Sequence, residues 1–300
     1  MQLKSTCLLI GAALFALPTL TQAQPTAHYP PGLEGIKAAS LPPPGVYLKD
    51  YNYFYYSDRL NDPSGHEIGG LNTRAFIYAN VPRVIWITDV QVLGGYLGVD
   101  GLLPLQYTDL RLDGVINDRT FGIGDFFLEG TWSRHLKQFD LALGYGVFAP
   151  TGDSANGPTT RAGLGYWTHM LTAGATWYID ADKLWAISAL NRYEFNMEHG
   201  QPGTTPGQAY TVEGGLSRTL CKNYDLGVVA YYQQKVTTDS GFYAKVGRDR
   251  VAGVGPEISV FCPKFGLFTS LRYLYEFMAE GTANGRLQGH TIALTLTRRF

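Results

Sequence analysis

The C-terminal stretch of the chain alternates apolar and polar side chains with a period of two; it reads GHTIALTLTRRF. Its even positions hold Ile292, Leu294, Leu296, Arg298 and Phe300, and its odd positions hold mostly hydroxyl or small side chains. A two-residue period predicts a β-strand with one apolar and one polar face. Bulky apolar side chains outside and hydroxyls inside are typical of a barrel with lipid around it and water within.

The terminal Phe300 resembles the C-terminal signature by which the barrel-assembly machinery recognises outer-membrane barrels for insertion. Arg298 departs from that signature, because an apolar or aromatic residue is usual at its position. An arginine near a membrane interface can extend its charged end into water. We therefore take Phe300 as an insertion signal.

Alternating segments continue through the chain and predict an all-β fold, a transmembrane antiparallel up-and-down barrel of about twelve strands. Turn clusters rich in Gly, Pro, Asn and Asp separate the segments. An even number of strands returns both termini to one side, which we expect to be the periplasm. The predicted strands cover residues 45–57, 70–88, 94–112, 121–135, 140–150, 163–180, 184–196, 209–220, 224–237, 250–261, 265–278 and 289–300.

The connections between these segments alternate in length, which supports the same topology. Short turns are typical of the periplasmic side of such barrels and long loops of the outer side. The short connections are 136–139, 180–183, 221–223 and 262–264; the long ones are 57–69, 151–162, 197–208, 240–249 and 279–288.

Composition changes the picture mainly by exclusion. Only 16% of the residues are charged, against about 25% in an average soluble domain, whereas 36 Gly, 20 Tyr and 15 Phe suit barrel bends and aromatic girdles. The mature chain has no apolar run of the ~20 residues that a spanning helix needs. A net charge of -1 argues against a nucleic-acid partner.

The first 23 residues have the pattern of a secretory signal peptide. Lys4 precedes the apolar core 7–18, and Ala23 provides a small residue for cleavage. Cys7 lies at the start of the apolar core, whereas the cysteine of a lipoprotein signal would lie at its end. We expect a mature chain that begins at Gln24 and resides in the outer membrane of a Gram-negative cell.

Residues 24–44 form a Pro-rich arm ahead of the barrel, which occupies 45–300. Proline has no N–H to give to a strand ladder, so this stretch is not part of the wall. Two interpretations stay open: a disordered periplasmic lead, or a partial plug folded into the lumen. The apolar residues Leu33, Ile36 and Leu41 favour the second.

Charged residues share the inward parity of several predicted strands, if apolar side chains mark the lipid side. They either satisfy one another structurally inside a small barrel or form a polar constriction that selects what passes, and both roles are compatible. Arg74 and Asp100 follow the same pattern less clearly. The predicted lumen-lining charges are Asp125, Glu129, Arg192, Glu194, Glu213, Glu257, Arg272 and Glu276.

Cys221 and Cys262 both fall in predicted short turns at neighbouring hairpin ends. The periplasm permits disulfides. Adjacent hairpin ends lie roughly two strand spacings of ~4.8 Å apart, which exceeds the ~6 Å Cα separation that a bridge prefers unless the turns lean together. A disulfide and two free thiols are both open.

The sequence does not have the motifs of an enzyme or of a cofactor or metal site. Its His residues are scattered without paired spacing for a metal. Outer-membrane phospholipases also have twelve strands, but His169, the one mid-strand candidate, has no Ser at the right parity beside it. Residues 122–125 and the Gly-rich stretch after Gly157 lack the strand-to-helix context of a phosphate loop.

Several stretches together resemble the family of MetA-pathway phenol-degradation proteins, also called outer-membrane transporter-like proteins. They are spread through nearly the whole mature chain and read PPGLEGIKAASLPPPGVYL, GIGDFFLEGTW, FDLALGYGVFAPTGD, GLGYWTHMLTAGATWYID, WAISALNRYEFN and TLTRRF. The resemblance implies an outer-membrane barrel linked to catabolism of aromatic or other hydrophobic compounds, and it supplies no catalytic residue. We predict a channel for small hydrophobic or aromatic solutes. The alternatives are an adhesive barrel that binds a partner through its loops, and a barrel enzyme.

Overall fold

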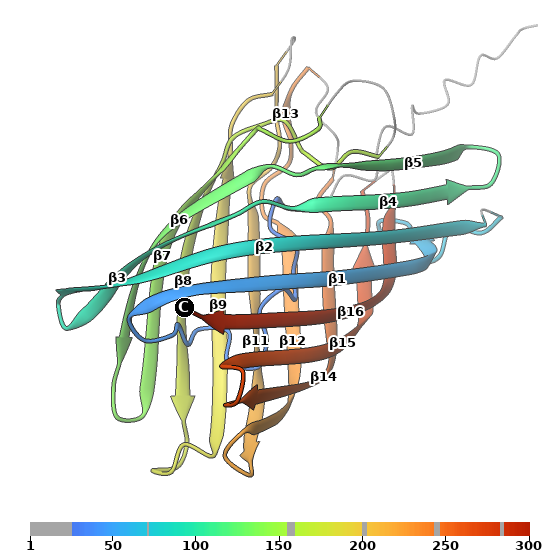
Figure 1. Ribbon diagram of the computed structural model, residues 1–300. Helices are drawn as coiled ribbons and strands as arrows, with labels where there is room; N and C mark the ends of the chain where they lie inside the picture. Colours follow the sequence, from blue (N-terminus) through green and yellow to red (C-terminus); the bar gives the residue numbers. More distant parts are fainter. Residues whose placement is uncertain (1–25, 71, 155–159, 200–202, 243–246, 283–284) are drawn as a thin grey trace, which may run out of the picture.

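The structure, a computed structural model, describes residues 26–70, 72–154, 160–199, 203–242, 247–282 and 285–300. These residues form sixteen strands and no helix. Fourteen of the strands make one antiparallel sheet, which closes because β1 pairs with β16 on one side and with β2 on the other. The molecule is therefore a closed barrel (Figure 1).

Ten strands cross the wall without interruption, and two further wall strands are each broken into two pieces. The broken ones are β3 (Gly95–Leu102) with β4 (Leu105–Leu112), and β5 (Ile116–Ile123) with β6 (Phe126–His135). The uninterrupted ones are β1 (Gly45–Asn61), β2 (Thr73–Val92), β7 (Phe139–Ala149), β8 (Thr168–Tyr178), β9 (Trp185–Asn196), β11 (Ala209–Leu220), β12 (Tyr224–Lys235), β14 (Arg250–Cys262), β15 (Leu267–Glu280) and β16 (Arg286–Arg299). The wall thus has twelve strands, and β10 (Thr204–Thr205) pairs with β13 (Ser240–Gly241) outside it.

The breaks in the two interrupted strands lie side by side in the wall. The amide of Leu103 donates to the carbonyl of Pro82 at 3.3 Å, and the amide of Gly124 donates to that of Pro104 at 2.7 Å. Proline cannot donate to a ladder, so regular pairing is lost where Pro82 and Pro104 come together. This break places Asp125, directly after Gly124, at a bend between β5 and β6.

The predicted barrel of twelve strands is confirmed, and the largest differences are at strand ends. The fourth wall strand begins at Ile116 instead of 121, because the polar run Asn117–Thr120 hides the alternation although it pairs regularly with β4. The sixth begins at Thr168 instead of 163, since the Gly-rich residues before it form a loop. The signal peptide lies outside the described residues.

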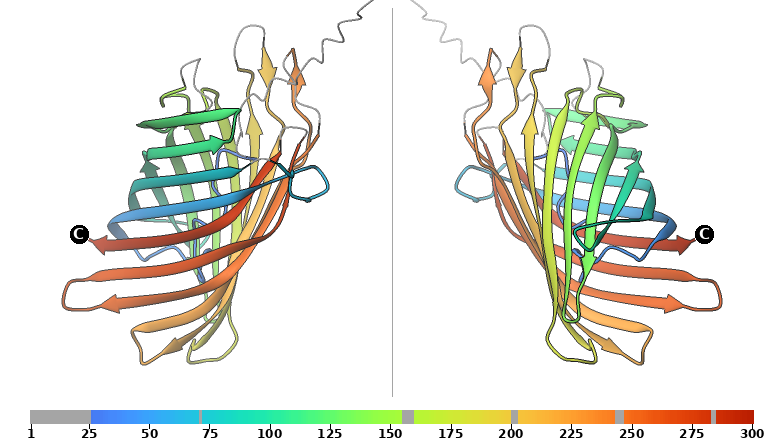
Figure 2. Two further views of the ribbon diagram at one scale, coloured as in Figure 1. Left: turned by 90° about the vertical axis from the view of Figure 1, so that its right-hand side faces the viewer. Right: turned by 90° about the vertical axis from the view of Figure 1, so that its left-hand side faces the viewer.

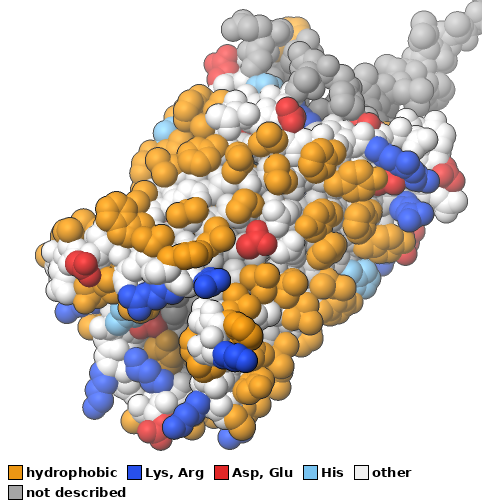
Figure 3. Space-filling view, viewed as in Figure 1, with side chains coloured by type: hydrophobic (Ala, Val, Ile, Leu, Met, Phe, Trp, Pro, Cys, Tyr) orange, Lys and Arg blue, Asp and Glu red, His pale blue; other side chains and the backbone are white. Residues whose placement is uncertain are grey.

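The outer face of the wall is apolar and the inner face is largely polar, as the parity argument predicts. On β9, Trp185 and Ile187 are exposed, whereas Ser188 and Arg192 are buried. Strand β15 follows the same rule. Figure 3 shows hydrophobic side chains covering the outer surface over β1, β2, β15 and β16.

Strand β2 departs from the parity rule and corrects one expectation. Its inward residues include Ile77 and Val81, and its outward ones include Val84 and Trp86, so both faces are apolar. An apolar outer face alone therefore does not reveal which side chains point inward. Arg74 lies on the outward parity and is exposed, so its predicted lumen position is wrong.

A small polar group interrupts the outer face where β1 pairs with β2. Asp50 accepts hydrogen bonds from Asn52 and Asn80 at 2.9 Å each, and the hydroxyl of Tyr78 donates to Asn52 at 2.9 Å. Mutual hydrogen bonds reduce the cost of placing polar groups on an apolar surface.

The buried core of the molecule lies inside the barrel, where residues 26–44, the N-terminal arm, run along the lumen (Figure 2). Leu33 packs with Tyr51 and Phe127, and Ile36 packs with Val229 and Leu274. The described residues include no helix that is long and apolar enough to cross a membrane. The arm and the inner face of the wall together form the buried core of the barrel.

Candidate functional site

The N-terminal arm passes through the lumen as irregular backbone. Ala27, Leu33 and Ala39 are at most 3% exposed, so the arm is enclosed along most of its length. The described part of the arm pairs with no wall strand. Buried N–H and C=O groups need partners, and here side chains of the wall must provide them.

Carboxylates of the wall accept hydrogen bonds from the arm's amides. Glu194 accepts from the amides of His28 and Tyr29 at 2.7 and 3.1 Å. Glu213 accepts from the amide of Glu34 at 3.2 Å. Glu257 accepts from the amide of Ile36 at 3.1 Å. The wall thus holds successive amides of the arm as an N-cap side chain holds the free amides of a helix.

Cationic and amide side chains hold the arm's carbonyls in the same way. Arg272 donates to the carbonyls of Gly32 and Leu33 at 3.0 and 2.6 Å, and Gln233 donates to that of Tyr29 at 2.8 Å. Gly32 has φ +77° and a β-carbon there would lie 2.7 Å from Leu274, so glycine alone fits this turn.

Glu34 is the arm residue with the densest set of polar contacts. Its carboxylate accepts from Lys49 at 2.5 Å, from the hydroxyl of Tyr51 at 2.8 Å and from Arg83 at 3.0 Å, and Arg192 lies 4.0 Å away. Burial raises its pKa, but these cations lower it more, so the pKa of Glu34 is well below its usual value. The arm therefore carries a negative charge here at neutral pH.

Arg192 contacts the arm through the aromatic ring of Tyr29 as well as through charge. The guanidinium lies 4.0 Å from the ring centre of Tyr29 and is paired with Glu213. Burial raises the pKa of Tyr29, so its hydroxyl stays protonated and donates to Glu213 at 2.5 Å. A guanidinium over an aromatic face is favourable, more so when it is desolvated.

Each end of the arm is fastened separately. Near the short turns, Lys37 pairs with Asp225 at 2.8 Å and the hydroxyl of Ser40 donates to Asp140 at 2.8 Å.

At the other end of the arm, the imidazole of His28 lies 2.9 Å from Asp125. The same imidazole lies 3.0 Å from the Thr168 hydroxyl and stacks on Phe148 with ring centres 4.2 Å apart. Asp125 in turn accepts from the amides of Gly152 and Leu164 at 2.9 and 2.6 Å, which ties residues 150–154 and 160–167 to the arm.

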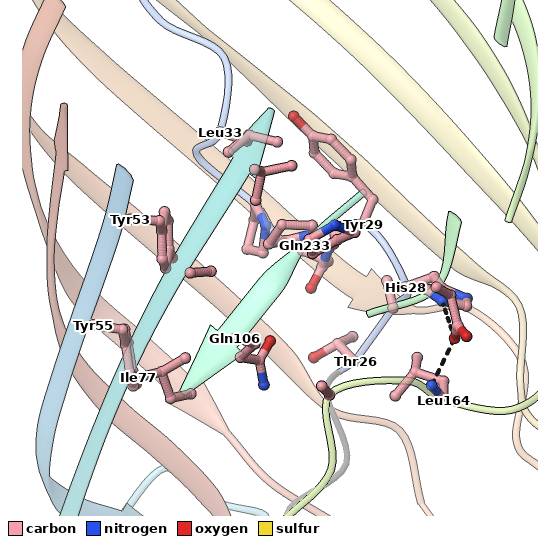
Figure 4. Close-up of a pocket in the computed structure, with 18 of the residues that line it drawn as sticks. Thr26, His28, Tyr29, Leu33, Tyr53, Tyr55, Ile77, Gln106, Leu164 and Gln233 are labelled. Atoms are coloured by element: carbon pink, nitrogen blue, oxygen red, sulfur yellow. Dashed lines mark hydrogen bonds and ion pairs between the residues drawn. The ribbon is translucent and has the colours of Figure 1, made fainter. Parts of the chain in front are cut away.

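A cavity of about 310 Å³ lies between the arm and strands β1, β2 and β4. Figure 4 shows Tyr53, Tyr55 and Ile77 on one side of it and Tyr29 and His28 on the other. Most of its lining surface is apolar, but Gln106, Thr108 and seven charged residues also line it, namely Arg83, Asp125, Glu129, Arg161, Arg192, Glu276 and Arg286. The apolar lining residues include Ala75, Ile77, Ala79, Val81, Leu102, Leu110, Phe127, Phe148, Leu164 and Met170.

The predicted lumen charges are all at most 4% exposed and lie inside the barrel. The structure brings together Arg192 with Glu213, and Arg272 with Glu257 at 3.4 Å. Several of them hold the arm directly, which sequence parity could not show. The eight are Asp125, Glu129, Arg192, Glu194, Glu213, Glu257, Arg272 and Glu276.

Glu129 and Glu276 are the two members of this set that serve the wall instead of the arm. Glu129 accepts from Arg83 at 3.1 Å and from Thr172 at 2.8 Å. Glu276 accepts from the hydroxyls of Tyr55 and Tyr231 at 2.8 and 3.1 Å. These contacts fit the structural interpretation, in which inward charges satisfy one another.

Sequence reasoning missed the cations that surround Glu34. Arg83 makes a bidentate pair with Asp100 at 2.8 Å for both contacts, and it reaches Glu34 and Glu129 as well. It follows Pro82 in an apolar run, so the signal was a single charge among inward Val and Ile. Lys49 was hidden in the Tyr-rich start of β1.

The two cysteines are free thiols in the structure, Cys221 exposed and Cys262 partly exposed. The disulfide considered from the sequence is therefore not formed here. Within the described ranges, no group of three or more His, Cys, Asp or Glu is placed to hold a metal. His169 contacts the hydroxyl of Tyr145 at 2.6 Å in an exposed position on the outer face.

The chain matches one family of sequences and resembles several solved structures in its fold. A family model described as "Putative MetA-pathway of phenol degradation" matches residues 57–296, which confirms the family resemblance. The COG4313 outer membrane channel from Pseudomonas putida F1 has a TM-score of 0.78 and 14% identity, over 91% of this chain and 100% of that chain. At this identity, the similarity shows a shared fold.

Two further solved structures are less similar. The transport unit of the autotransporter AIDA-I from Escherichia coli has a TM-score of 0.49 and 11% identity, over 85% of this chain and 90% of that chain. The NanC porin has a TM-score of 0.47 and 10% identity, over 84% of this chain and 100% of that chain. No curated protein sequence matches this chain.

Proposed function

The chain belongs to the family described as "Putative MetA-pathway of phenol degradation", and we propose that it is an outer-membrane channel for small hydrophobic or aromatic compounds. The observation that carries this proposal is an apolar cavity inside a closed barrel whose inner face is otherwise polar. The proposed function includes no catalytic step.

The proposed location rests on the outer surface of the wall. Exposed large apolar residues occur on almost every wall strand, for example Leu128, Leu143, Leu171, Leu226 and Ile292. A closed ladder with such an exterior satisfies its own backbone and suits lipid. We place the short turns, the start of β1 at Gly45 and the C-terminus in the periplasm, and we propose that Phe300, 72% exposed, is what the barrel-assembly machinery binds.

The size and lining of the cavity support a cargo of one or two aromatic rings. An engineered apolar cavity of 150 Å³ binds benzene, and the cavity here measures about 310 Å³. Its apolar lining favours uncharged ring atoms, and Gln106 and Thr108 offer hydrogen bonds to a hydroxyl. We further propose that residues 24–44 are a plug that closes the lumen at rest.

Two valines of β2 provide a matched test of the cavity's role. Val81 is 6% exposed and lines the cavity, whereas Val84 is 55% exposed on the outer face. Val81→Phe should occupy part of the cavity and lower channel-dependent uptake of a radiolabelled monocyclic aromatic compound about ten-fold, a loss of roughly 1.4 kcal/mol of binding. Val84→Phe should leave uptake unchanged.

Both variants should run as folded barrels on an unboiled detergent gel, because a closed ladder has no free edge from which to unfold. Ala79→Leu, which places a smaller side chain than phenylalanine in the same cavity, substitutes for Val81→Phe if that variant folds poorly. Equal uptake by the folded Val81 and Val84 variants would remove the cavity from the transport path. Extraction of the protein with the soluble periplasmic fraction would refute the outer-membrane location.

A further inference from the structure

The contacts around Glu34 have the composition of an occupied anion site. Its carboxylate accepts from one ammonium, one guanidinium and one phenol, all supplied by the wall strands β1 and β2. The carboxylate itself belongs to the arm, which is not part of the wall. The donors Lys49, Tyr51 and Arg83 therefore form a preassembled receptor, and Glu34 fills it.

Lys49 is the part of this receptor that depends on Glu34 most. Arg83 keeps Asp100 and Glu129 as partners whether or not Glu34 is present. In the described part of the chain, Lys49 has Glu34 as its one carboxylate within 4 Å, and its other recorded contact is the ring of Tyr51 at 4.8 Å. If Glu34 leaves, one partly buried ammonium loses its counter-charge, which is costly unless another anion replaces it.

An aromatic ring of the arm lies close to this carboxylate in the chain and shares a partner with it. Tyr29 stacks on the guanidinium of Arg192, and the same arginine lies 4.0 Å from Glu34. Tyr29 and Glu34 thus present an aromatic ring and a carboxylate to one group of cations. Arg83, Arg192 and Tyr29 also border the apolar cavity, so a ring held in the cavity lies beside two of these cations.

We propose that Lys49, Tyr51 and Arg83 bind the carboxylate of an aromatic acid, and that Glu34 and Tyr29 of the arm occupy this site while the channel is plugged. The proposal deepens the proposed function, on which it rests, by naming aromatic carboxylates as a cargo class. An entering acid competes with Glu34 for the same donors, and its ring takes up the cavity beside them.

The test compares two probes that share one ring, 4-fluorobenzoate and 4-fluorobenzyl alcohol, with binding measured by fluorine NMR on the protein in non-ionic detergent. Glu34→Gln removes the competing charge and frees Lys49. The dissociation constant for the benzoate should fall about ten-fold relative to wild type, the effect of one charged hydrogen bond. The constant for the alcohol should stay within about two-fold.

Three further variants separate the anion site from simple loosening of the arm. Adding Lys49→Gln to Glu34→Gln should return benzoate binding to the wild-type level. Adding Lys137→Gln, a change at an exposed turn, should leave the gain in place. Lys37→Gln loosens the other end of the arm without freeing Lys49, so it should show no gain for benzoate.

Each outcome decides the proposal. An equal gain for both probes in Glu34→Gln, or a gain that survives Lys49→Gln, would overturn it. No gain at all in Glu34→Gln would overturn it too, and Glu34→Ala repeats that measurement if the first variant does not give the gel shift of a folded barrel. Binding of the alcohol and the contrast between Val81 and Val84 would persist in all of these cases if the channel function is correct.

Discussion

Two sides of the lumen use the same alternating strands for opposite purposes. On the arm-facing wall, formed by β9, β11, β14 and β15, the inward residues include Glu194, Glu213, Glu257 and Arg272. On the cavity-facing wall, formed by β2 and β4 with the second half of β1, inward positions hold mostly Ala, Ile, Val, Leu and Tyr, with Arg83, Gln106 and Thr108 as the polar exceptions that line the cavity. The charged wall touches backbone, and the apolar wall borders open space.

The difference follows from what each wall must solvate. An irregular backbone buried in a barrel exposes many N–H and C=O groups, and leaving one unpaired costs about 1–3 kcal/mol. Charged side chains supply strong partners for them, and the arm's groups in turn satisfy those charges. The cavity has no such demand, and apolar side chains there leave room for an apolar solute. Clusters of inward charge therefore mark where the arm lies, and the mostly apolar inward positions of β2 and β4 mark where cargo would lie.

Deleting residues 26–41 removes the arm and should abolish the difference between the two walls. Both walls would then face one water-filled lumen, of a size between a filled eight-stranded barrel and a sixteen-stranded channel. We expect single-channel conductance in a planar bilayer to rise at least about ten-fold. The freed carboxylates would be hydrated, so the barrel should stay folded and heat-modifiable. A folded deletion variant that conducts no better than wild type would show that the arm is not the plug.

Replacing two arginines of the arm-facing wall should loosen the arm without removing it. Arg192→Ala with Arg272→Ala removes the stacking on Tyr29 and the donors to the carbonyls of Gly32 and Leu33. It also leaves Glu213 and Glu257 without their cations, and breaking one buried pair costs about 3–5 kcal/mol. We expect higher conductance than wild type, smaller than after deletion, and a lower folding yield.

Arg250→Ala is the matched control for this double variant. Arg250 also pairs with a glutamate, Glu280, at 2.7 Å, but at an exposed position near the long loops. An exposed pair contributes about 0–1 kcal/mol, so neither conductance nor folding yield should change. Unchanged conductance in a fully folded Arg192 and Arg272 double variant would deny these arginines a role in closing the pore.

The sequence predicted the wall well because each strand carries its own evidence. Alternation along β9 or β16 is a local pattern, and the short turns mark the strand ends independently. Expectations failed where both faces are apolar, as for Arg74 on β2, because periodicity then contains no contrast. The break at Pro82 and Pro104 splits wall strands without changing their number, so the count of twelve survived it.

The site was only half predictable, for a physical reason. Parity identified Glu194, Glu213 and Arg272 as inward, but their partners belong to the arm, which has no period to place it. Contacts such as that of Arg83 with Glu34 join residues whose proximity depends on how the arm threads the closed barrel. The Pro-rich composition showed that the arm is not a strand, and the structure shows where it lies.

His28 lies where the two walls meet and gives the smallest and most specific test of the contrast. It belongs to the arm, borders the cavity and contacts Asp125 at the bend between β5 and β6. Burial lowers the pKa of His28 below its usual value of 6.5, although Asp125 opposes the shift. The docked imidazole is therefore neutral, and its contribution to docking is complete above pH 6.5.

Below that pH the released arm takes up a proton that the docked arm does not, so the docking free energy falls as the pH decreases through the lowered pKa. We expect conductance to rise about two- to three-fold between pH 7 and pH 5, which corresponds to well under one pKa unit of linkage. His28→Gln keeps a hydrogen-bonding side chain but cannot titrate, and its conductance should be nearly flat over this range. Conductance at each pH, measured for both proteins in the same bilayer, checks this. If the His28→Gln channel opens with the same pH profile as wild type, the sensitivity belongs to the carboxylates of the arm-facing wall and not to His28.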